Sequence, residues 1–131
     1  MSETRRKGND SGVYIAVFNL TRPRRISVGR LGRFYFPPGF YLYVGSAKRG
    51  LEARLARHGR REKPLRWHID YLSTRAEMLG AIVSDGQTHG ECELADELAE
   101  MHTRFIPGFG SSDCRCGGHL FHSPTLTPLT R

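Results

Sequence analysis

Long apolar runs are absent from this 131-residue sequence. None approaches the roughly 20 residues that a membrane-spanning helix requires, so no transmembrane segment is predicted. The first residues, Met1 to Gly8, lack the apolar stretch of a secretory signal peptide. We therefore expect a cytoplasmic protein, in which the three cysteines argue against a disulfide framework.

The chain also lacks an internal repeat and any linker that would divide it. Its length suits a single domain, and a composition of 38% hydrophobic and 25% charged residues is typical of a globular protein with one core. Residues 1–11 are polar and basic, which predicts a disordered arm. The Pro- and Thr-rich residues 122–131 predict a flexible tail, so the expected domain is 12–121.

Acidic residues are scarce in the first half of the chain. Residues 1–67 contain 16 Lys or Arg and 4 Asp or Glu, a balance of +12, whereas residues 68–131 contain 4 and 9, a balance of −5. This asymmetry indicates a surface suited to a polyanion, although a solvated basic surface fits the charge equally well. Nucleic acid is the expected polyanion, because each neutralised phosphate releases counterions. A membrane surface is disfavoured, since no segment joins the charge to a strong apolar stripe.

Residues with strand character dominate the first half. Segments 13–20 and 40–44 are rich in β-branched and aromatic residues, and a short hairpin is expected between them, over residues 26–36. The first half is therefore predicted to form an antiparallel meander. The apolar run 78–83 predicts a further strand, central and covered on both faces.

The periodicity becomes helical after Gly45. Leu51 and Leu55 form an apolar stripe within residues 50–59, and Pro64 can open a second helix over 65–73. A third helix is predicted over 91–102. The expected fold class is α+β, a small antiparallel β-sheet of residues 13–20, 40–44 and 78–83 flanked by helices.

Two triplets mark the two strongest strands. Gly12-Val13-Tyr14 opens the first strand, and Tyr43-Val44-Gly45 closes the second. Each is weakly informative alone, because strand tyrosines usually pack in a core. They are followed by Arg54 and His58, one helical turn apart, and then by a helix that begins with Glu91. This order, over residues 12–107, resembles the GIY-YIG nuclease superfamily.

The resemblance implies a metal-dependent endonuclease that hydrolyses phosphodiester bonds of DNA. It implies that Tyr14 and Tyr43 bracket the scissile phosphate and position or deprotonate the attacking water. Arg54 would stabilise the charge that builds on the phosphate, and His58 would help to activate the nucleophile. Many members carry an Asn soon after the Glu-bearing helix, and this sequence has none at residues 103–108.

The metal-binding acid implied by the resemblance is either Glu91 or Glu93. Glu91 has apolar residues at i+3, i+4 and i+7 and so heads the face expected to pack on the sheet. Glu93 has acidic residues at i+3 and i+4 and is expected to face solvent. A single carboxylate can hold Mg²⁺ or Mn²⁺ together with water and phosphate oxygens. We therefore predict Glu91 as the metal ligand.

Three further segments, residues 65–72, 91–95 and 108–121, are similar to the Uri-type branch of small endonucleases. That domain is sometimes fused to endonuclease III-type repair proteins, which implies repair of single-stranded, branched or damaged DNA. Two alternatives stay open, a non-catalytic DNA-binding repair accessory of the same fold and an RNA-cleaving nuclease. His68 and Asp70 either reach the active site or cap and brace a helix.

Basic residues flank the motif segments on loops and a helix. No arrangement that reads bases is evident, so they are expected to contact the nucleic acid backbone. The predicted nucleic-acid-binding residues are Arg22, Arg24, Arg25, Lys48, Arg49, Arg57, Arg60 and Arg61.

The cysteines allow a second metal site. Cys114, Cys116 and His119 lie within six residues of a Gly-rich loop, and Cys92 could complete a Cys₃His zinc site. A Cys-x-Cys pair with one His is less specific than paired zinc knuckles, and Cys92 could equally be a small core residue. In a third interpretation Cys114 or Cys116 is a reactive thiol. We favour a loop that braces Glu91 over structural zinc.

Overall fold

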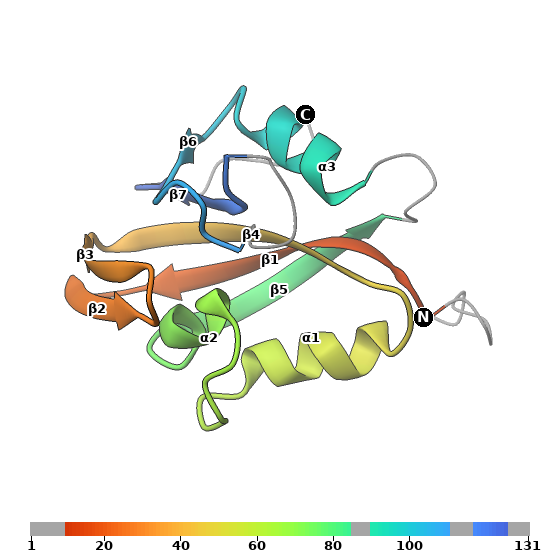
Figure 1. Cartoon of the computed structure of the whole chain (residues 1–131), viewed down its shortest axis with the longest axis horizontal. Coiled ribbons are helices and arrows are strands. Elements are labelled where there is room, and N and C mark those ends of the chain that lie inside the picture. Colours follow the sequence, from red (N-terminus) through yellow and green to blue (C-terminus); the bar gives the residue numbers. More distant parts are fainter. Residues whose placement is uncertain (1–9, 85–89, 111–116, 126–131) are drawn as a thin grey trace.

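A five-stranded antiparallel sheet organises the computed structural model, which describes residues 10–84, 90–110 and 117–125. The strand order is β5–β1–β4–β7–β6 (Figure 1). The strands are β1 (Gly12–Leu20), β4 (Gly39–Ala47), β5 (Glu77–Ser84), β6 (Thr103–Arg104) and β7 (Leu120–Ser123). A separate two-stranded sheet consists of β2 (Arg24–Val28) and β3 (Gly32–Phe36).

Helices lie on both faces of the large sheet (Figure 1). Helices α1 (Leu51–Gly59) and α2 (His68–Ser73) lie on one side, and α3 (Glu91–Leu98) lies on the other, against β4. The predicted α+β class, with a small antiparallel sheet flanked by helices, is confirmed.

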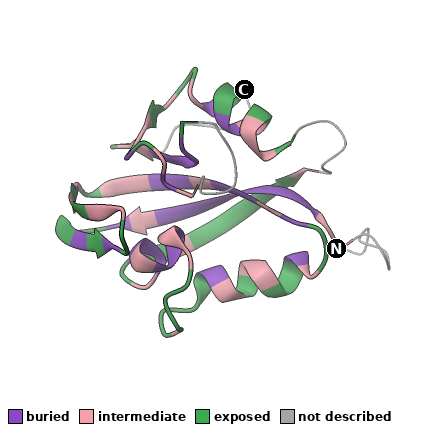
Figure 2. Ribbon diagram, viewed as in Figure 1, coloured by how far each residue is buried: buried purple, intermediate pink, exposed green. Residues whose placement is uncertain are grey.

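Alternation along β1 divides its side chains between two cores. Tyr14 and Phe18 point to the side of α1 and α2, where they join a cluster that includes Leu51 and Leu72. Val13, Ile15 and Val17 point to the other side and join the cluster that includes Ala95 and Leu98 of α3. Both faces of β1 are therefore buried, as the purple strand in Figure 2 shows.

Several element boundaries differ from the prediction. The hairpin is present, but it forms its own sheet, because β1 pairs directly with β4 over its whole length; the predicted meander is wrong. Helix α2 begins at His68 rather than residue 65. The Asp70 carboxylate accepts the backbone N–H groups of Arg66 and Trp67, which fixes them ahead of the first helical residue. Helix α3 ends at Leu98 and continues as turns, and strands β6 and β7 were not predicted.

The prediction that 78–83 is a central, covered strand is wrong. In the described sheet β5 is an edge strand that pairs with β1 alone, and it is drawn mostly in the colour of exposed residues in Figure 2. Leu79 is 47% exposed and Ile82 is 44% exposed. An apolar run fixes neither the position of a strand in its sheet nor the number of faces that other elements cover.

The expected arm and tail fall mostly on residues 1–9 and 126–131, which lie outside the described residues. His122 and Ser123, expected in the tail, belong to β7. Within the described ranges no helix is long and apolar enough to span a membrane.

Leu72 and Leu79 differ in burial, so their truncation to alanine should lower the free energy of unfolding by different amounts. Leu72 is fully buried against the first core, so Leu72→Ala should lower the free energy of unfolding by about 3 kcal/mol. Leu79→Ala, on the exposed edge, should lower it by less than about 1 kcal/mol. Urea unfolding of both variants measures these costs. Equal losses of unfolding free energy would contradict the exposed position of Leu79 on β5.

Candidate active site

A cleft lies beside the part of β4 that follows Tyr43, which β7 does not cover. Strand β7 pairs with β4 only from Phe40 to Tyr43, and the carbonyl of His119 accepts the N–H of Val44 as the last link between them. The rest of β4 continues past that point without β7. A cleft of about 260 Å³ lies here, lined by Tyr14, Tyr43, Gly45, Ser46, Arg54, Arg66, Trp67, His68, Glu91 and Gly110.

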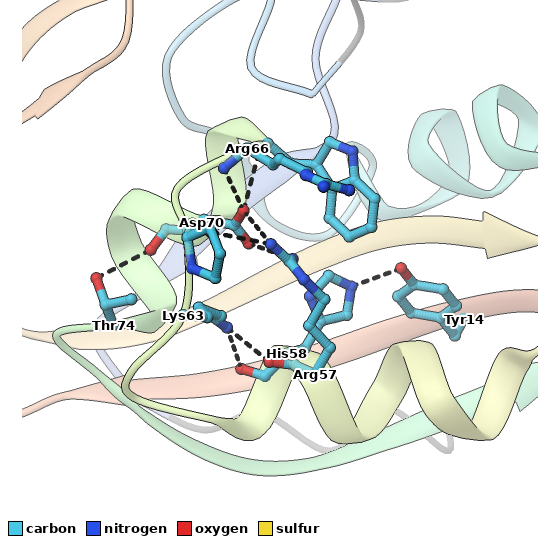
Figure 3. Close-up of polar contacts among 9 residues, drawn as sticks. Tyr14, Arg57, His58, Lys63, Arg66, Asp70 and Thr74 are labelled. Carbon is cyan, nitrogen blue, oxygen red and sulfur yellow. Dashed lines mark hydrogen bonds and ion pairs between the residues drawn. The ribbon is translucent and has the colours of Figure 1, made fainter.

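The two predicted triplets meet across neighbouring strands. In the β1–β4 register Tyr14 is the partner of Gly45, and the Tyr14 ring lies across the glycine. A Cβ atom at Gly45 would lie 2.5 Å from the Tyr14 hydroxyl and 2.6 Å from Cζ, so only glycine fits beneath this ring. The hydroxyl thereby reaches His58 on α1, with 2.7 Å between Oη and Nε2 (Figure 3).

Burial keeps the Tyr14–His58 pair neutral. It raises the pKa of Tyr14 to about 12, although the adjacent Arg54 guanidinium opposes the rise. Burial, with a contribution from the nearby Lys63 ammonium, lowers the pKa of His58 to about 4. In the tautomer of His58 that carries its proton on Nδ1, the Tyr14 hydroxyl donates to Nε2. Burial also raises the pKa of Tyr43, whose ring meets that of His58 edge-on at 5.8 Å.

Ser46 connects the basic and acidic sides of the cleft. The Arg54 guanidinium donates to the carbonyl oxygen of Ser46 at 2.7 Å, and it lies 4.8 Å from the centre of the Trp67 ring. The Ser46 hydroxyl donates to Glu91 Oε2 at 2.8 Å. One strand residue therefore holds a fixed cation and a fixed carboxylate at the same cleft.

Glu91 enters the cleft from the far face of the sheet, as the first residue of α3. Its Oε2 is held by Ser46, and its Oε1 lies 3.7 Å from His119 Nδ1. Glu93 is exposed and accepts the N–H of Gly90 instead, so it lies outside the cleft. The described residues contain no cluster of three His, Cys, Asp or Glu that could hold a metal ion. A single carboxylate beside open space suits a hydrated Mg²⁺ or Mn²⁺, which commonly keeps several waters.

Arg57, predicted to bind nucleic acid, has a different environment. Its guanidinium donates two hydrogen bonds to the buried Asp70 carboxylate, at 2.8 and 2.9 Å, and stacks on Trp67 at 4.4 Å (Figure 3). Burial alone would raise the pKa of Asp70. Hydrogen bonds from Arg57 and from the N–H groups of Trp67 and Arg66 outweigh burial and lower it. Arg57 therefore joins α1 to the start of α2 rather than lining the cleft.

A comparison with protein families gave a match to the family described as domain of unknown function DUF123, over residues 13–131. The chain belongs to DUF123. This family is GIY-YIG-like, which supports the expected superfamily, and the match indicates no branch of it. No curated protein and no solved structure matched the chain.

The other basic residues predicted in this DUF123 chain are exposed. They lie on the β1–β2 connection and β2, on the β4–α1 connection and after α1, and they are Arg22, Arg24, Arg25, Lys48, Arg49, Arg60 and Arg61. Sequence reasoning did not include Arg66, which lines the cleft, although it lies close to the basic loop of residues 60–63. It also missed Ser46 and Gly110, because small residues outside a motif carry no chemical signal.

The predicted zinc ligands are only partly described. Cys92 Sγ lies 3.9 Å from His119 Nε2, so two of the four residues come together on the α3 side of the cleft. Cys114 and Cys116 lie outside the described residues. The zinc hypothesis, and the competing interpretation in which the loop braces Glu91, therefore stay predictions.

The Asp70–Arg57 pair predicts a pH-dependent stability. Because the folded pKa of Asp70 lies below its usual 3.8, the pair stabilises the fold above that pH and loses its effect as pH falls below it. Asp70→Asn should lower the free energy of unfolding by roughly 3 kcal/mol at pH 7, and by less below pH 4.

A matched variant tests whether burial is the cause. Asp96→Asn removes a carboxylate that is 69% exposed and paired with Arg104, and it should cost less than about 1 kcal/mol. Denaturant unfolding between pH 3 and pH 7 compares the two. A cost for Asp70→Asn that is small, or that does not change with pH, would refute this role of the pair.

Proposed function

We propose that this DUF123 chain is a metal-dependent endonuclease that hydrolyses phosphodiester bonds of DNA. One observation carries the proposal. Tyr14, Tyr43, Arg54 and Glu91, which come from β1, β4, α1 and α3, line a single cleft of about 260 Å³. Two hydroxyls, a guanidinium and a carboxylate are the groups that a GIY-YIG nuclease needs.

The charges of the cleft suit a phosphodiester. Arg54 and Arg66 both line it, and Arg54 is fixed by the carbonyl of Ser46 and the ring of Trp67. A fixed guanidinium can stabilise the additional negative charge of a pentavalent phosphate without rearranging during the reaction. The exposed basic residues outside the cleft lining would hold the flanking backbone.

The Tyr14–His58 hydrogen bond provides a route for the proton of the attacking water. As the water oxygen bonds to phosphorus, its proton passes to Tyr14 Oη while the Tyr14 proton passes to His58 Nε2. The bond from phosphorus to the leaving oxygen breaks, and solvent protonates that oxygen. Both groups start neutral, because burial lowers the pKa of His58 to about 4 and raises that of Tyr14 to about 12. In the tautomer of His58 with its proton on Nδ1, the lone pair of Nε2 can take the proton that Tyr14 gives up.

Glu91 is the residue that would hold the divalent metal. Its Oε2 accepts the Ser46 hydrogen bond, which fixes the carboxylate in the lining of the cleft. A bound Mg²⁺ or Mn²⁺ would supply Lewis-acid stabilisation of the phosphate and the leaving oxygen.

The substrates that fit best are single-stranded, branched or damaged DNA in repair. A domain of this size is too small to read a long duplex sequence, and a cleft at the sheet edge suits a strand that leaves the duplex. The similarity to Uri-type endonucleases, which are sometimes fused to endonuclease III-type proteins, supports the same class.

Loss of the metal ligand should abolish cutting and leave binding. Glu91→Gln should lower the single-turnover cleavage rate by roughly 10²–10³, and Arg54→Ala should lower it as much, because each removes stabilisation of the transition state. The measurement uses labelled single-stranded, duplex, flap and abasic-site DNA, and RNA, with Mg²⁺ or Mn²⁺. DNA affinity of Glu91→Gln should stay near that of the wild type.

Glu93→Gln is the matched control, since its amide oxygen can still accept the N–H of Gly90. It should cut like the wild type. Cleavage by Glu91→Gln at the wild-type rate, or in excess EDTA, would refute the chemistry. Binding without cutting by the wild type would favour a repair accessory, and cutting of RNA alone would reassign the substrate.

The exposed arginines predict a salt-dependent affinity. Replacement of Arg22, Arg24, Arg25, Arg60 and Arg61 by alanine should weaken binding uniformly across sequences. It should also reduce the slope of log affinity against log salt, by up to about one for each phosphate that is no longer neutralised. Fluorescence anisotropy at several salt concentrations measures the slope. An unchanged slope would mean that these residues contact no phosphate.

A further inference from the structure

His68 lies at the cleft with one ring nitrogen already engaged. It is the first residue of α2 and lines the cleft together with Gly110. The N–H of Gly110 donates to His68 Nδ1 at 2.9 Å. The imidazole also packs on the buried Phe109, with 5.5 Å between the ring centres and 59° between their planes. The ring is thus held from two sides by one loop.

This hydrogen bond decides where the imidazole carries its proton. A backbone N–H can only donate, so Nδ1 must be unprotonated, and the neutral ring carries its proton on Nε2. Burial also lowers the pKa of His68, which favours the same neutral form. Among the described residues no group bonds Nε2. The cleft therefore receives a fixed N–H donor that does not depend on a positive charge.

The loop that fixes His68 adopts an unusual backbone conformation to do so. Ile106 has φ of 62°, a left-handed conformation that β-branched residues rarely adopt, and Gly110 has φ of 73°. A Cβ at Gly110 would lie 3.0 Å from the Tyr43 ring, so the loop packs closely on a cleft tyrosine. Backbone hydrogen bonds hold it, with the N–H of His119 donating to the carbonyl of Phe109 at 2.8 Å. Such strain is most common where a backbone group has to be placed precisely.

We propose that His68 is a substrate-binding residue whose Nε2–H donates a hydrogen bond to a phosphate oxygen of single-stranded DNA in the cleft. The proposal deepens the proposed function and rests on it for the identity of the ligand. Arg54 and Arg66 supply the positive charge of the cleft. His68 adds a neutral donor of fixed direction, which orients the phosphate that the two cations attract.

Two amide variants separate substrate binding from a structural role. In His68→Asn the side-chain oxygen can take the place of Nδ1 and keep the Gly110 contact, but nothing reaches the position of Nε2. In His68→Gln the amide nitrogen can take the place of Nε2, while the acceptor for Gly110 is lost. A residue that only holds the loop would tolerate Asn better than Gln, and a residue that donates to substrate would tolerate Gln better than Asn.

The probe is a short oligothymidylate in EDTA, so that binding is measured without cleavage. His68→Asn should weaken its affinity by roughly 10- to 100-fold, the loss expected for a hydrogen bond to a charged group. His68→Gln should recover most of that affinity, and both variants should melt within a few degrees of the wild type. Long-range ¹H–¹⁵N spectra of the wild-type imidazole should show protonated Nε2 and a shift of its signal on titration.

Either of two results overturns the proposal: a His68 Nε2 signal that does not move at saturating oligonucleotide, or affinity that is lost in Gln and kept in Asn. The affinity assay does not require cleavage, so a wild type that binds through His68 but does not cut would refute the nuclease and leave this inference standing. A wild type that cuts, with an Asn variant of full affinity, would refute this inference alone.

Discussion

The contact on which the rest of the site depends is the passage of the Tyr14 ring across Gly45. Antiparallel pairing of β1 and β4 places the two residues opposite each other, and the missing side chain at Gly45 gives the ring room. The hydroxyl then reaches His58 on α1 inside the core rather than at the surface. This gives a physical reason for two motifs 29 positions apart, counted from Tyr14 to Tyr43, because one supplies the ring and the other supplies the space beside it.

A second set of contacts holds the helical side of the cleft. Asp70 engages Arg57 and the backbone before α2, and Arg57 and Arg54 both stack on Trp67. Trp67 therefore contacts both the arginine that lines the cleft and the one that binds Asp70. Figure 3 shows the Arg57–Asp70 part of this network next to the Tyr14–His58 pair. Such support matters because a shift of about 1 Å at a catalytic group can cost 10²-fold in rate.

Much of this could be predicted from the sequence, and the failures have physical causes. The strands of the first half followed from their β-branched and aromatic residues. The helix carrying Arg54, and the position of Glu91 rather than Glu93 beside the sheet, followed from periodicity, which reports which face of an element is buried. The edge position of β5 did not follow, since apolar character says nothing about the number of neighbours a strand has. The separation of β2 and β3 into their own sheet was missed for the same reason. The ion pair of Arg57 was not foreseen, because its partner Asp70 lies thirteen residues away in the sequence.

Residues of the cleft without a chemical signature were harder to find. Ser46 and Gly110 act through backbone and hydroxyl groups whose positions depend on how loops fold, and Arg66 resembled any other arginine near a basic loop. His68 was recognised as having two interpretations, and its Gly110 hydrogen bond and its place in the cleft lining exist only in the folded chain.

The central claim is that the ring of Tyr14, held over Gly45, makes this cleft a site of phosphodiester hydrolysis. Its most direct test is the single-turnover cleavage rate of Gly45→Ala compared with Gly80→Ala, the same change in β5, where an added Cβ meets nothing within 4 Å. Gly45→Ala should lose about 10²-fold in rate or more, because the displaced ring no longer reaches His58, and Gly80→Ala should cut at the wild-type rate. A folded Gly45→Ala variant that cuts DNA as fast as the wild type would contradict this claim.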